Sequence, residues 1–243
     1  MSYLMAPLYA HFDSGFGATG EAFKEAADRL SEIEQKEGNK LWHTQLPINY
    51  LYRHAIELFL KSAIVIFHRR FKLAYGEAPY DADPMVKVGD KWKPFNHAHS
   101  IAVLWAYVNE LFDTYDKWLL DNTKCNNWKF DPTMDALITI IEEGDPRSTF
   151  FRYPTIRDPQ ADVTKSIMKE VDEATLADAF KNSNPPENRV LALVVQDEDT
   201  GDFIRGYKLG DEGDTKLDQA LKSVAETLGG YHAALRFEVT NHQ

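Results

Sequence analysis

Four polar residues recur at every fourth position of an otherwise apolar segment, residues 47–67, which reads PINYLYRHAIELFLKSAIVIF. They are Asn49, Arg53, Glu57 and Lys61. On a helix this spacing stacks them on one face, where they can form a ladder of i,i+4 ion pairs, at about 0.3–0.5 kcal/mol per pair, on the one solvated side of a buried helix. They can also, together with His54, face a cleft into which Arg152 or Arg157 points, and there bind a phosphate group. The sequence leaves both interpretations open.

Two histidines and one cysteine are the other residues whose chemistry has to be considered. His97 and His99, in NHAHS, share a side if that segment is extended, and two imidazoles so placed can begin a metal site. The sequence assigns no further ligands, so we expect neither a metal nor a cofactor. Cys125 has no disulfide partner, which favours a reducing, cytoplasmic setting and a packed or surface thiol. The chain also lacks GxxxxGK, HExxH, CxxC and GxSxG, the signatures of common hydrolases and redox enzymes.

Composition and charge exclude several classes of protein. Of the 243 residues, 44% are hydrophobic and 27% are charged, as in ordinary globular proteins, and no apolar run approaches the roughly 18 residues that span a bilayer. We therefore expect no membrane contact, and an N-terminus that is neither signal nor anchor. The net charge of −11 argues against a non-specific coat on nucleic acid. Acidic residues are concentrated between Asp158 and Asp218, where 15 stand against 7 basic ones.

A cluster of basic residues in the first half of the chain has two interpretations. It comprises Lys61, His68, Arg69, Arg70, Lys72, Lys87, Lys91 and Lys93. The cluster is either a basic surface patch or a set of cations that complement the C-terminal end of a helix dipole.

Hydrophobic periodicity predicts a mainly helical protein. Apolar residues at helical spacing predict helices over 21–36, 47–67, 101–115 and 133–143, with Ser100 as the N-cap of the third and Gly144 as the end of the fourth. Residues 76–99 show neither helical nor strand period and are expected to form a long connection. A last helix over 217–235 is expected to be interrupted or ended at Gly229-Gly230.

The pattern changes between the fourth and the last helix. Prolines in DPRSTFFRYPTIRD exclude a long continuous helix, and a short helix is predicted over 171–180. Strand-like runs at 190–196 and 203–209, joined by DEDTGD, predict a β-hairpin. An isolated hairpin is marginal in water, so we expect it to lean on the helical body. The predicted architecture is one helical domain over 1–243, with an acidic segment, 158–214, that carries the hairpin before the last helix.

The segments RHAIELFLKSAI, HSIAVLW and FFRYP, in this order, resemble the HEPN superfamily, whose name stands for higher eukaryotes and prokaryotes nucleotide-binding. The resemblance covers residues 16–158 and the last helix, and leaves out the acidic hairpin segment. It implies a HEPN-like helical bundle that forms a homodimer in toxin–antitoxin, phage-defence or stress systems. Many members are metal-independent ribonucleases, in which a histidine moves a proton as the RNA 2′-OH attacks its phosphate and a preceding arginine stabilises the developing charge.

The chain departs from the ribonuclease pattern at FFRYP. Arg152 is followed by YPTIRD, without a histidine, whereas a formal match occurs at Arg236 and His242. Arg236 and His242 are therefore the candidate catalytic residues. The candidate ligand-binding residues are Arg53, His54, Glu57, Lys61, His99, Arg152 and Arg157.

The missing histidine leads us to expect a non-catalytic, dimeric HEPN-like module that binds RNA, a nucleotide or a partner protein in bacterial stress or defence. The alternative is a metal-independent ribonuclease that uses Arg236 and His242, aided by His97 or His99 from a facing surface. A third hypothesis is a structural interaction protein whose acidic hairpin region binds a basic partner.

Overall fold

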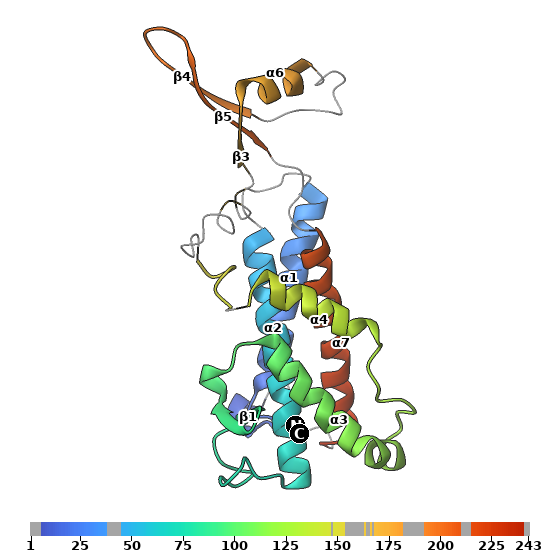
Figure 1. Ribbon diagram of the computed structural model, residues 1–243. Helices are drawn as coiled ribbons and strands as arrows, with labels where there is room; N and C mark the ends of the chain where they lie inside the picture. The colour runs from blue at the N-terminus through green and yellow to red at the C-terminus, as the bar shows by residue number, and fades with distance from the viewer. Residues whose placement is uncertain are drawn as a thin grey trace.

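The computed structural model describes residues 6–37, 45–146, 148–153, 163, 166, 168–181, 192–209 and 215–240. Within these residues the chain is mainly helical, as predicted, with one two-stranded and one three-stranded sheet (Figure 1). The helices are α1 (Phe16–Glu37), α2 (Gln45–Phe71), α3 (Ile101–Asn122), α4 (Thr133–Gly144), α6 (Glu173–Lys181) and α7 (Thr215–Glu238). Two short 3-10 helices, η2 (Leu8–Ala10) and η3 (Phe95–His97), precede α1 and α3.

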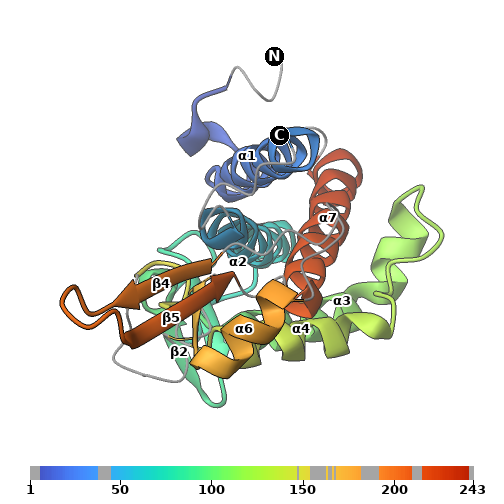
Figure 2. The ribbon, with the colours of Figure 1, turned by 90° about the horizontal axis from the view of Figure 1, so that it is seen from above.

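Helix α2 is the centre of the bundle. It packs against α1, α3 and α7, and Figure 2 shows these helices around it from above. Every residue from Tyr52 to His68 except His54 is buried. This burial matches the prediction that apolar residues around most of a helix require cover on several sides. None of the helices in the described part of the chain is long and apolar enough to cross a membrane.

Helix α1 begins earlier than predicted because Asp13 caps it. The Asp13 carboxylate accepts the backbone N–H groups of Gly15 at 3.0 Å and Gly17 at 2.7 Å, which satisfies amides at the start of the helix. Helix α1 then approaches its neighbours closely. A Cβ atom on Gly17 would lie 1.9 Å from the ring of His232 in α7, and one on Gly20 would lie 3.0 Å from the ring of Phe59 in α2.

Two predicted helix boundaries are confirmed and a third is wrong. Helix α3 begins after Ser100, whose Oγ accepts the Val103 N–H at 3.2 Å, and α4 ends at Gly144. Helix α7, by contrast, continues through Gly229 and Gly230. Each glycine costs roughly 1 kcal/mol relative to alanine, which packing can overcome. The buried face of α7 that supplies this packing includes Leu221, Val224, Ala225, Leu228 and Leu235.

Residues 76–99 were predicted to form an irregular connection but contain a β-hairpin. Strand β1 (Met85–Val88) pairs antiparallel with β2 (Lys91–Pro94) across the turn Gly89-Asp90, where Gly89 has a φ of +59°. A two-residue turn with a glycine in this conformation is typical of tight hairpins. Trp92 of β2 packs edge-on against Tyr75 and Tyr107, which holds the hairpin on the bundle.

Helix α6 and three strands form a small β-lobe beyond one end of the bundle (Figure 1). Strand β5 (Phe203–Leu209) lies between β3 (Met168–Val171) and β4 (Ala192–Gln196), and both pairings are antiparallel. The predicted hairpin is therefore confirmed as β4 and β5, while β3 was not predicted. Leu176 of α6 packs directly on Gly206 of β5. A Cβ atom on Gly206 would lie 1.9 Å from the Cδ1 atom of Leu176. Among the described residues the hairpin thus leans on α6 and β3 rather than on the helical body, which corrects that prediction.

Candidate functional site

The polar stripe of α2 is buried, not solvated. Arg53, Glu57 and Lys61 are only 2%, 2% and 4% exposed. The ladder of ion pairs is present, with 2.7 Å between Lys61 Nζ and Glu57 Oε1 and 3.6 Å between Arg53 Nη1 and Glu57 Oε2. The expected solvated face is wrong because the segment before α3 and the turn after α4 cover the stripe. Removing charges from water is costly, so such groups are found paired, as they are here.

Arg53 ties the turn after α4 to the centre of the bundle. Its Nε lies 3.0 Å from Asp145 Oδ2, and its Nη1 donates to Ser148 Oγ at 2.7 Å. Its Nη2 donates to the carbonyl oxygens of His99 at 3.0 Å and Asp145 at 3.3 Å. Asp145 Oδ1 in turn accepts the backbone N–H groups of Thr149 and Phe150, at 2.8 and 2.9 Å. Arg53 therefore positions the turn that leads to Arg152.

Sequence reasoning did not find Asp145 and Ser148. A signal for Asp145 exists, because an aspartate just after a helix-ending glycine often accepts hydrogen bonds from the backbone that follows. Ser148 has a φ of +57°, an uncommon conformation for a residue other than glycine. In this conformation its side chain accepts the hydrogen bond from Arg53.

His99 carries the buried network to the surface. Its side chain is 39% exposed, its Nδ1 lies 3.1 Å from Glu57 Oε1, and its Nε2 lies 3.0 Å from the carbonyl oxygen of Asn96. The ring therefore lies between the buried carboxylate of Glu57 and the backbone of the segment before α3. Lys61 is held in the same place, because its Nζ also donates to the carbonyl of Phe95 at 2.9 Å. Arg53, Glu57, Lys61 and His99 thus come together in one network.

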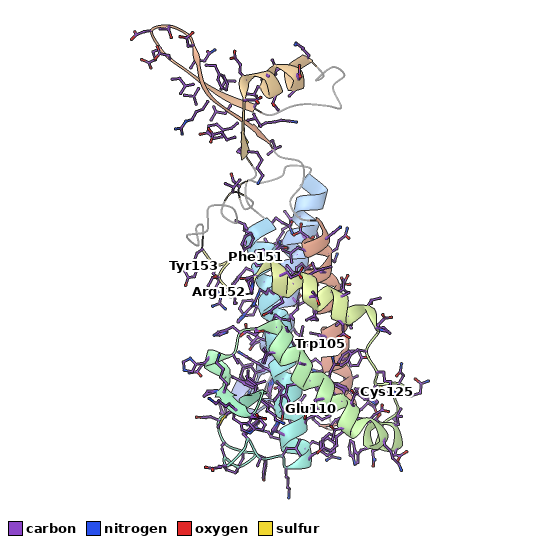
Figure 3. All side chains as sticks on the ribbon, in the orientation of Figure 1. Trp105, Glu110, Cys125, Phe151, Arg152 and Tyr153 are labelled. Carbon is purple, nitrogen blue, oxygen red and sulfur yellow. The ribbon has the colours of Figure 1, made fainter. Side chains whose placement is uncertain are left out.

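Tyr50 joins His54 to Arg152 outside this network. The imidazole of His54 stacks on the Tyr50 ring, with 5.9 Å between centroids and 5° between planes, and meets Phe23 edge-on at 4.5 Å. The Arg152 guanidinium carbon lies 5.7 Å from the centroid of Tyr50, and its side chain is exposed. Figure 3 shows Arg152 and Tyr153 at the outer edge of the turn after α4. Burial lowers the pKa of His54, and the nearby Arg152 acts in the same direction.

Of the remaining candidate residues, the structure describes Arg236 and His97. Arg157 and His242 lie outside the described residues. Arg236 lies in the last turn of α7, with its guanidinium carbon 4.6 Å from the centroid of the Phe237 ring. His97 is exposed, and no group of three or more His, Cys, Asp or Glu side chains within the described ranges is arranged to hold a metal ion.

A second polar cluster lies where α1, α2 and α7 meet. Ser62 Oγ donates to Asp13 Oδ2 at 2.5 Å and lies 3.1 Å from His232 Nδ1. These are the residue types of a hydrolase triad, but the serine stands between the carboxylate and the imidazole, and all three residues are buried. Burial lowers the pKa of His232 to about 4, so its ring is neutral at pH 7. The cluster therefore joins the helices and presents no nucleophile to a substrate.

The basic cluster of the first half divides between core and surface. His68 is buried, with Nδ1 2.7 Å from the carbonyl of Leu73 and Nε2 2.8 Å from the Tyr107 hydroxyl. Arg69 donates to the carbonyl of Phe12 at 2.8 Å, so its guanidinium anchors the segment before α1. The exposed members are Arg70, Lys72, Lys87, Lys91 and Lys93.

Comparisons of the chain with protein-family models, with curated proteins and with solved structures give no match.

Proposed function

We propose that the chain is a non-catalytic, dimeric HEPN-like module that binds the phosphate groups of RNA or of a nucleotide beside Arg152. The observation that carries the proposal is the placement of Arg152, an exposed guanidinium held above the ring of Tyr50. Arginine forms two parallel hydrogen bonds with a phosphate, and an aromatic ring beneath it restricts its orientation. His54, stacked on the same ring, and His99, at the surface of the buried network, flank the turn.

Arg53 and Lys61 support this site without contacting the ligand. The donors of Arg53 are taken up by Asp145, Ser148 and the His99 carbonyl, and Lys61 is taken up by Glu57 and the Phe95 carbonyl. A ligand would have to break these buried pairs to reach either cation, at a cost of several kcal/mol. We therefore assign ligand contact to Arg152 and positioning of its turn to Arg53.

Binding to RNA tests this proposal directly. A hydrogen bond to a charged group contributes about 1.5–3 kcal/mol, so Arg152→Ala should weaken binding of labelled mixed-sequence RNA in EDTA by about ten-fold or more. Fluorescence anisotropy at two salt concentrations measures the affinity. Arg29→Ala is the matched control, because Arg29 is an exposed arginine of α1 paired with Glu25. Absence of RNA and nucleotide binding by the wild type, or an equal loss in both variants, would contradict the proposed site.

The same samples distinguish the other parts of the proposal. RNA cleavage in EDTA that leaves 2′,3′-cyclic phosphate ends and is lost in His242→Ala would favour the ribonuclease alternative with Arg236 and His242. Light scattering of the purified protein gives the mass in solution, and a monomer at all concentrations would contradict the proposed dimer. The setting in bacterial stress or defence follows from the HEPN resemblance alone.

A further inference from the structure

Strand β4 forms an open edge of the small sheet in the β-lobe. It pairs with β5 on one side, and no strand of the described residues pairs with its other side. The N–H of Asp197 donates to the Asp202 carbonyl at 2.9 Å, and its own carbonyl accepts the Gly201 N–H at 3.0 Å, so both groups point across the hairpin. Backbone groups point alternately to the two sides of a strand, and those of Val194 and Gln196 therefore point to the open edge.

The side chains along this edge are apolar and exposed. Leu193, Val194 and Val195 are 57%, 39% and 38% exposed. Val194 lies opposite Gly206, the residue on which Leu176 of α6 packs, so Leu193 and Val195 stand on the other face of the sheet. Natural edge strands are commonly protected from pairing by charged residues or proline, and the sequence ALVVQ of β4 has neither. Strand β4 is therefore an edge at which a further strand can be added.

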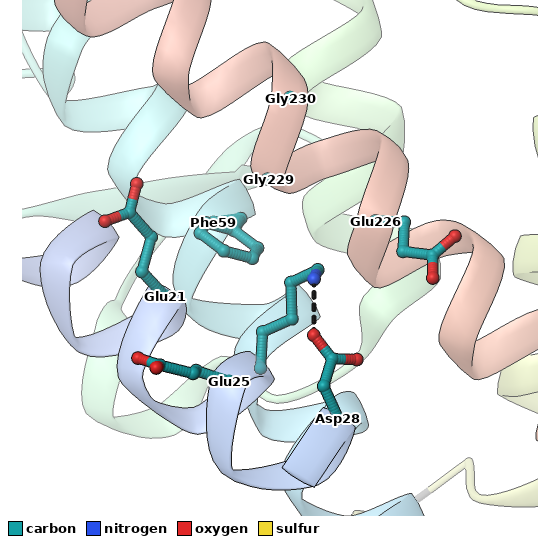
Figure 4. Close-up of a pocket in the computed structure, with 8 residues that line it drawn as sticks. Glu21, Glu25, Asp28, Phe59, Glu226, Gly229 and Gly230 are labelled. Carbon is teal, nitrogen blue, oxygen red and sulfur yellow. Dashed lines mark hydrogen bonds and ion pairs between the residues drawn. The ribbon is translucent and has the colours of Figure 1, made fainter. Parts of the chain in front are cut away.

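The turn after β4 places carboxylates without a cation partner at one end of this edge. Glu198, Asp199 and Asp202 are exposed, and none of them forms an ion pair with a residue of the described ranges. Carboxylates of the bundle differ in this respect. In the cavity between α1 and α7, for example, Asp28 is bound to Lys24 at 2.7 Å (Figure 4). The end of β4 consequently attracts positive charge that the described part of the chain does not supply.

The open edge and the charge beside it together select the kind of partner. An extended segment that pairs with β4 satisfies the backbone groups of the edge, and apolar residues at alternate positions of that segment cover Leu193 and Val195. Basic residues at one end of the segment then meet the acidic turn. A second copy of β4 would supply no cation, and the acidic turns of two copies would repel each other. Charge complementarity therefore favours a basic segment of another protein over self-pairing.

We propose that β4 binds an extended segment of a partner protein as an added antiparallel strand, with apolar residues along Leu193 and Val195 and basic residues beside the acidic turn, 197–202. Both pairings within this sheet are antiparallel. The same direction in the partner places its basic residues at the N-terminal end of its strand. This surface belongs to the β-lobe and the phosphate site at Arg152 belongs to the bundle, so either proposal can fail without the other.

A synthetic peptide tests the added strand. The probe is a labelled, blocked peptide of three lysines followed by alternating valine and threonine, and fluorescence anisotropy measures its binding to the full chain. The wild type should bind it. Val194→Pro should abolish binding, because proline removes an N–H of the open edge while the pairing of β4 with β5 is kept. Circular dichroism and melting of the variant check that the fold is retained.

A second variant tests the apolar face without altering the backbone. Leu193→Lys should weaken binding about ten-fold or more, because it removes an apolar contact and places a cation against a basic peptide. The exposed position of Leu193 allows this change in the folded protein. Leu120→Lys is the matched control, since Leu120 is an exposed leucine of α3 in the bundle, and its affinity should equal that of the wild type.

Charge at the turn is tested separately. The double variant Glu198→Gln, Asp199→Asn should bind the peptide about five-fold more weakly at low salt. Glu173→Gln should leave the affinity unchanged, because this exposed residue begins α6, after β3 at the other edge of the sheet. A peptide with proline in place of each threonine keeps the charge but loses backbone donors, and it should not bind.

Four results would overturn the assignment. Absence of peptide binding by the wild type excludes the added strand, and undiminished binding of the proline peptide means that charge alone attracts the probe. Equal affinities of Leu193→Lys and Leu120→Lys mean that the peptide lies elsewhere, and this pair decides if Val194→Pro does not fold. If light scattering shows a dimer that Leu193→Lys dissociates, a second copy occupies the edge and the assignment to another protein is wrong.

Discussion

Glu57 keeps its negative charge in the core because Lys61, Arg53 and the His99 imidazole surround it. Burial by itself would raise its pKa, but Lys61 at 2.7 Å and His99 at 3.1 Å outweigh this effect, and the pKa lies below its ordinary value. Arg53 is the third partner, with its Nη1 atom 3.6 Å from Glu57 Oε2. Since a buried charge without its partner is strongly destabilising, each member of this network depends on the others. The network therefore gives the turn that carries Arg152 a fixed place on α2.

His232 should make the stability of the protein depend on pH. Its pKa is about 4 in the folded protein, because the ring is buried, and about 6.5 in an unfolded chain. The unfolded state therefore binds a proton first as the pH falls, and folding stability is lost between about pH 6.5 and pH 4. The full effect is about 3 kcal/mol, at 1.36 kcal/mol for each pKa unit. Urea unfolding at pH 7, 5.5 and 4.5 measures it.

The variant His232→Gln isolates this contribution. Burial also lowers the pKa values of His54 and His68, so both act in the same direction as His232 and remain in the variant. The free energy of unfolding of His232→Gln should fall less steeply between pH 7 and pH 4.5 than that of the wild type. Parallel curves for the two proteins would show that His232 does not titrate as we infer.

Local spacing predicted which residues of the α2 stripe meet, but not their environment. An i,i+4 contact is fixed by the helix itself, so the pairs of Glu57 with Arg53 and Lys61 could be read from the sequence. Burial is decided by whatever packs on top, and the Ser148 that contacts Arg53 is 95 positions away along the chain. Tyr50 stands four residues before His54, so that contact could also have been read from the spacing, whereas the contact of Tyr50 with Arg152 joins distant parts of the chain.

Two glycines on different helices should respond in opposite ways to the same substitution. Gly17→Ala places a methyl group 1.9 Å from the His232 ring, and overpacking of this kind costs about 1–3 kcal/mol. Gly230→Ala meets nothing within 4 Å and should stabilise α7 by up to about 1 kcal/mol through helix propensity. Thermal or urea unfolding of the two variants beside the wild type measures both. A stabilised Gly17→Ala would mean that α1 does not approach α7 as closely as described.

Helices with clear end signals were predictable, and short strands were less so. Ser100 and Gly144 mark boundaries because the capping and stop interactions involve only neighbouring residues. The β1–β2 hairpin also had a local signal, the Gly89-Asp90 turn between alternating residues, which the lysines and proline around it obscured. Strand β3 had none, because its four residues are specified by pairing with β5.

Bundle and β-lobe differ in how their surfaces are covered. The bundle has α2 at its centre, whereas only Leu176 and Gly206 are buried among the described residues of the lobe. One face of the small sheet packs on α6, and Leu193 and Val195 of the edge strand β4 remain exposed. Eight acidic and four basic residues lie in 168–181 and 192–209, so the excess of acid predicted for this part of the chain is present in the lobe. The excess of negative charge and the small number of buried residues together predict that the lobe is less stable than the bundle.

Hydrogen exchange should resolve these two parts. Opening free energies follow the amount of buried surface around each segment, so amides of α2 between Ala55 and Phe67 should exchange only on global unfolding. Amides of β4 and β5 need only the lobe to open, and they should exchange at least about 100-fold faster at pH 7, which mass spectrometry of peptic peptides can measure. Low concentrations of urea should accelerate α2 more steeply than β4, because global unfolding exposes more surface. Equal rates and equal urea dependence in both parts would instead mean that bundle and lobe unfold as one cooperative unit.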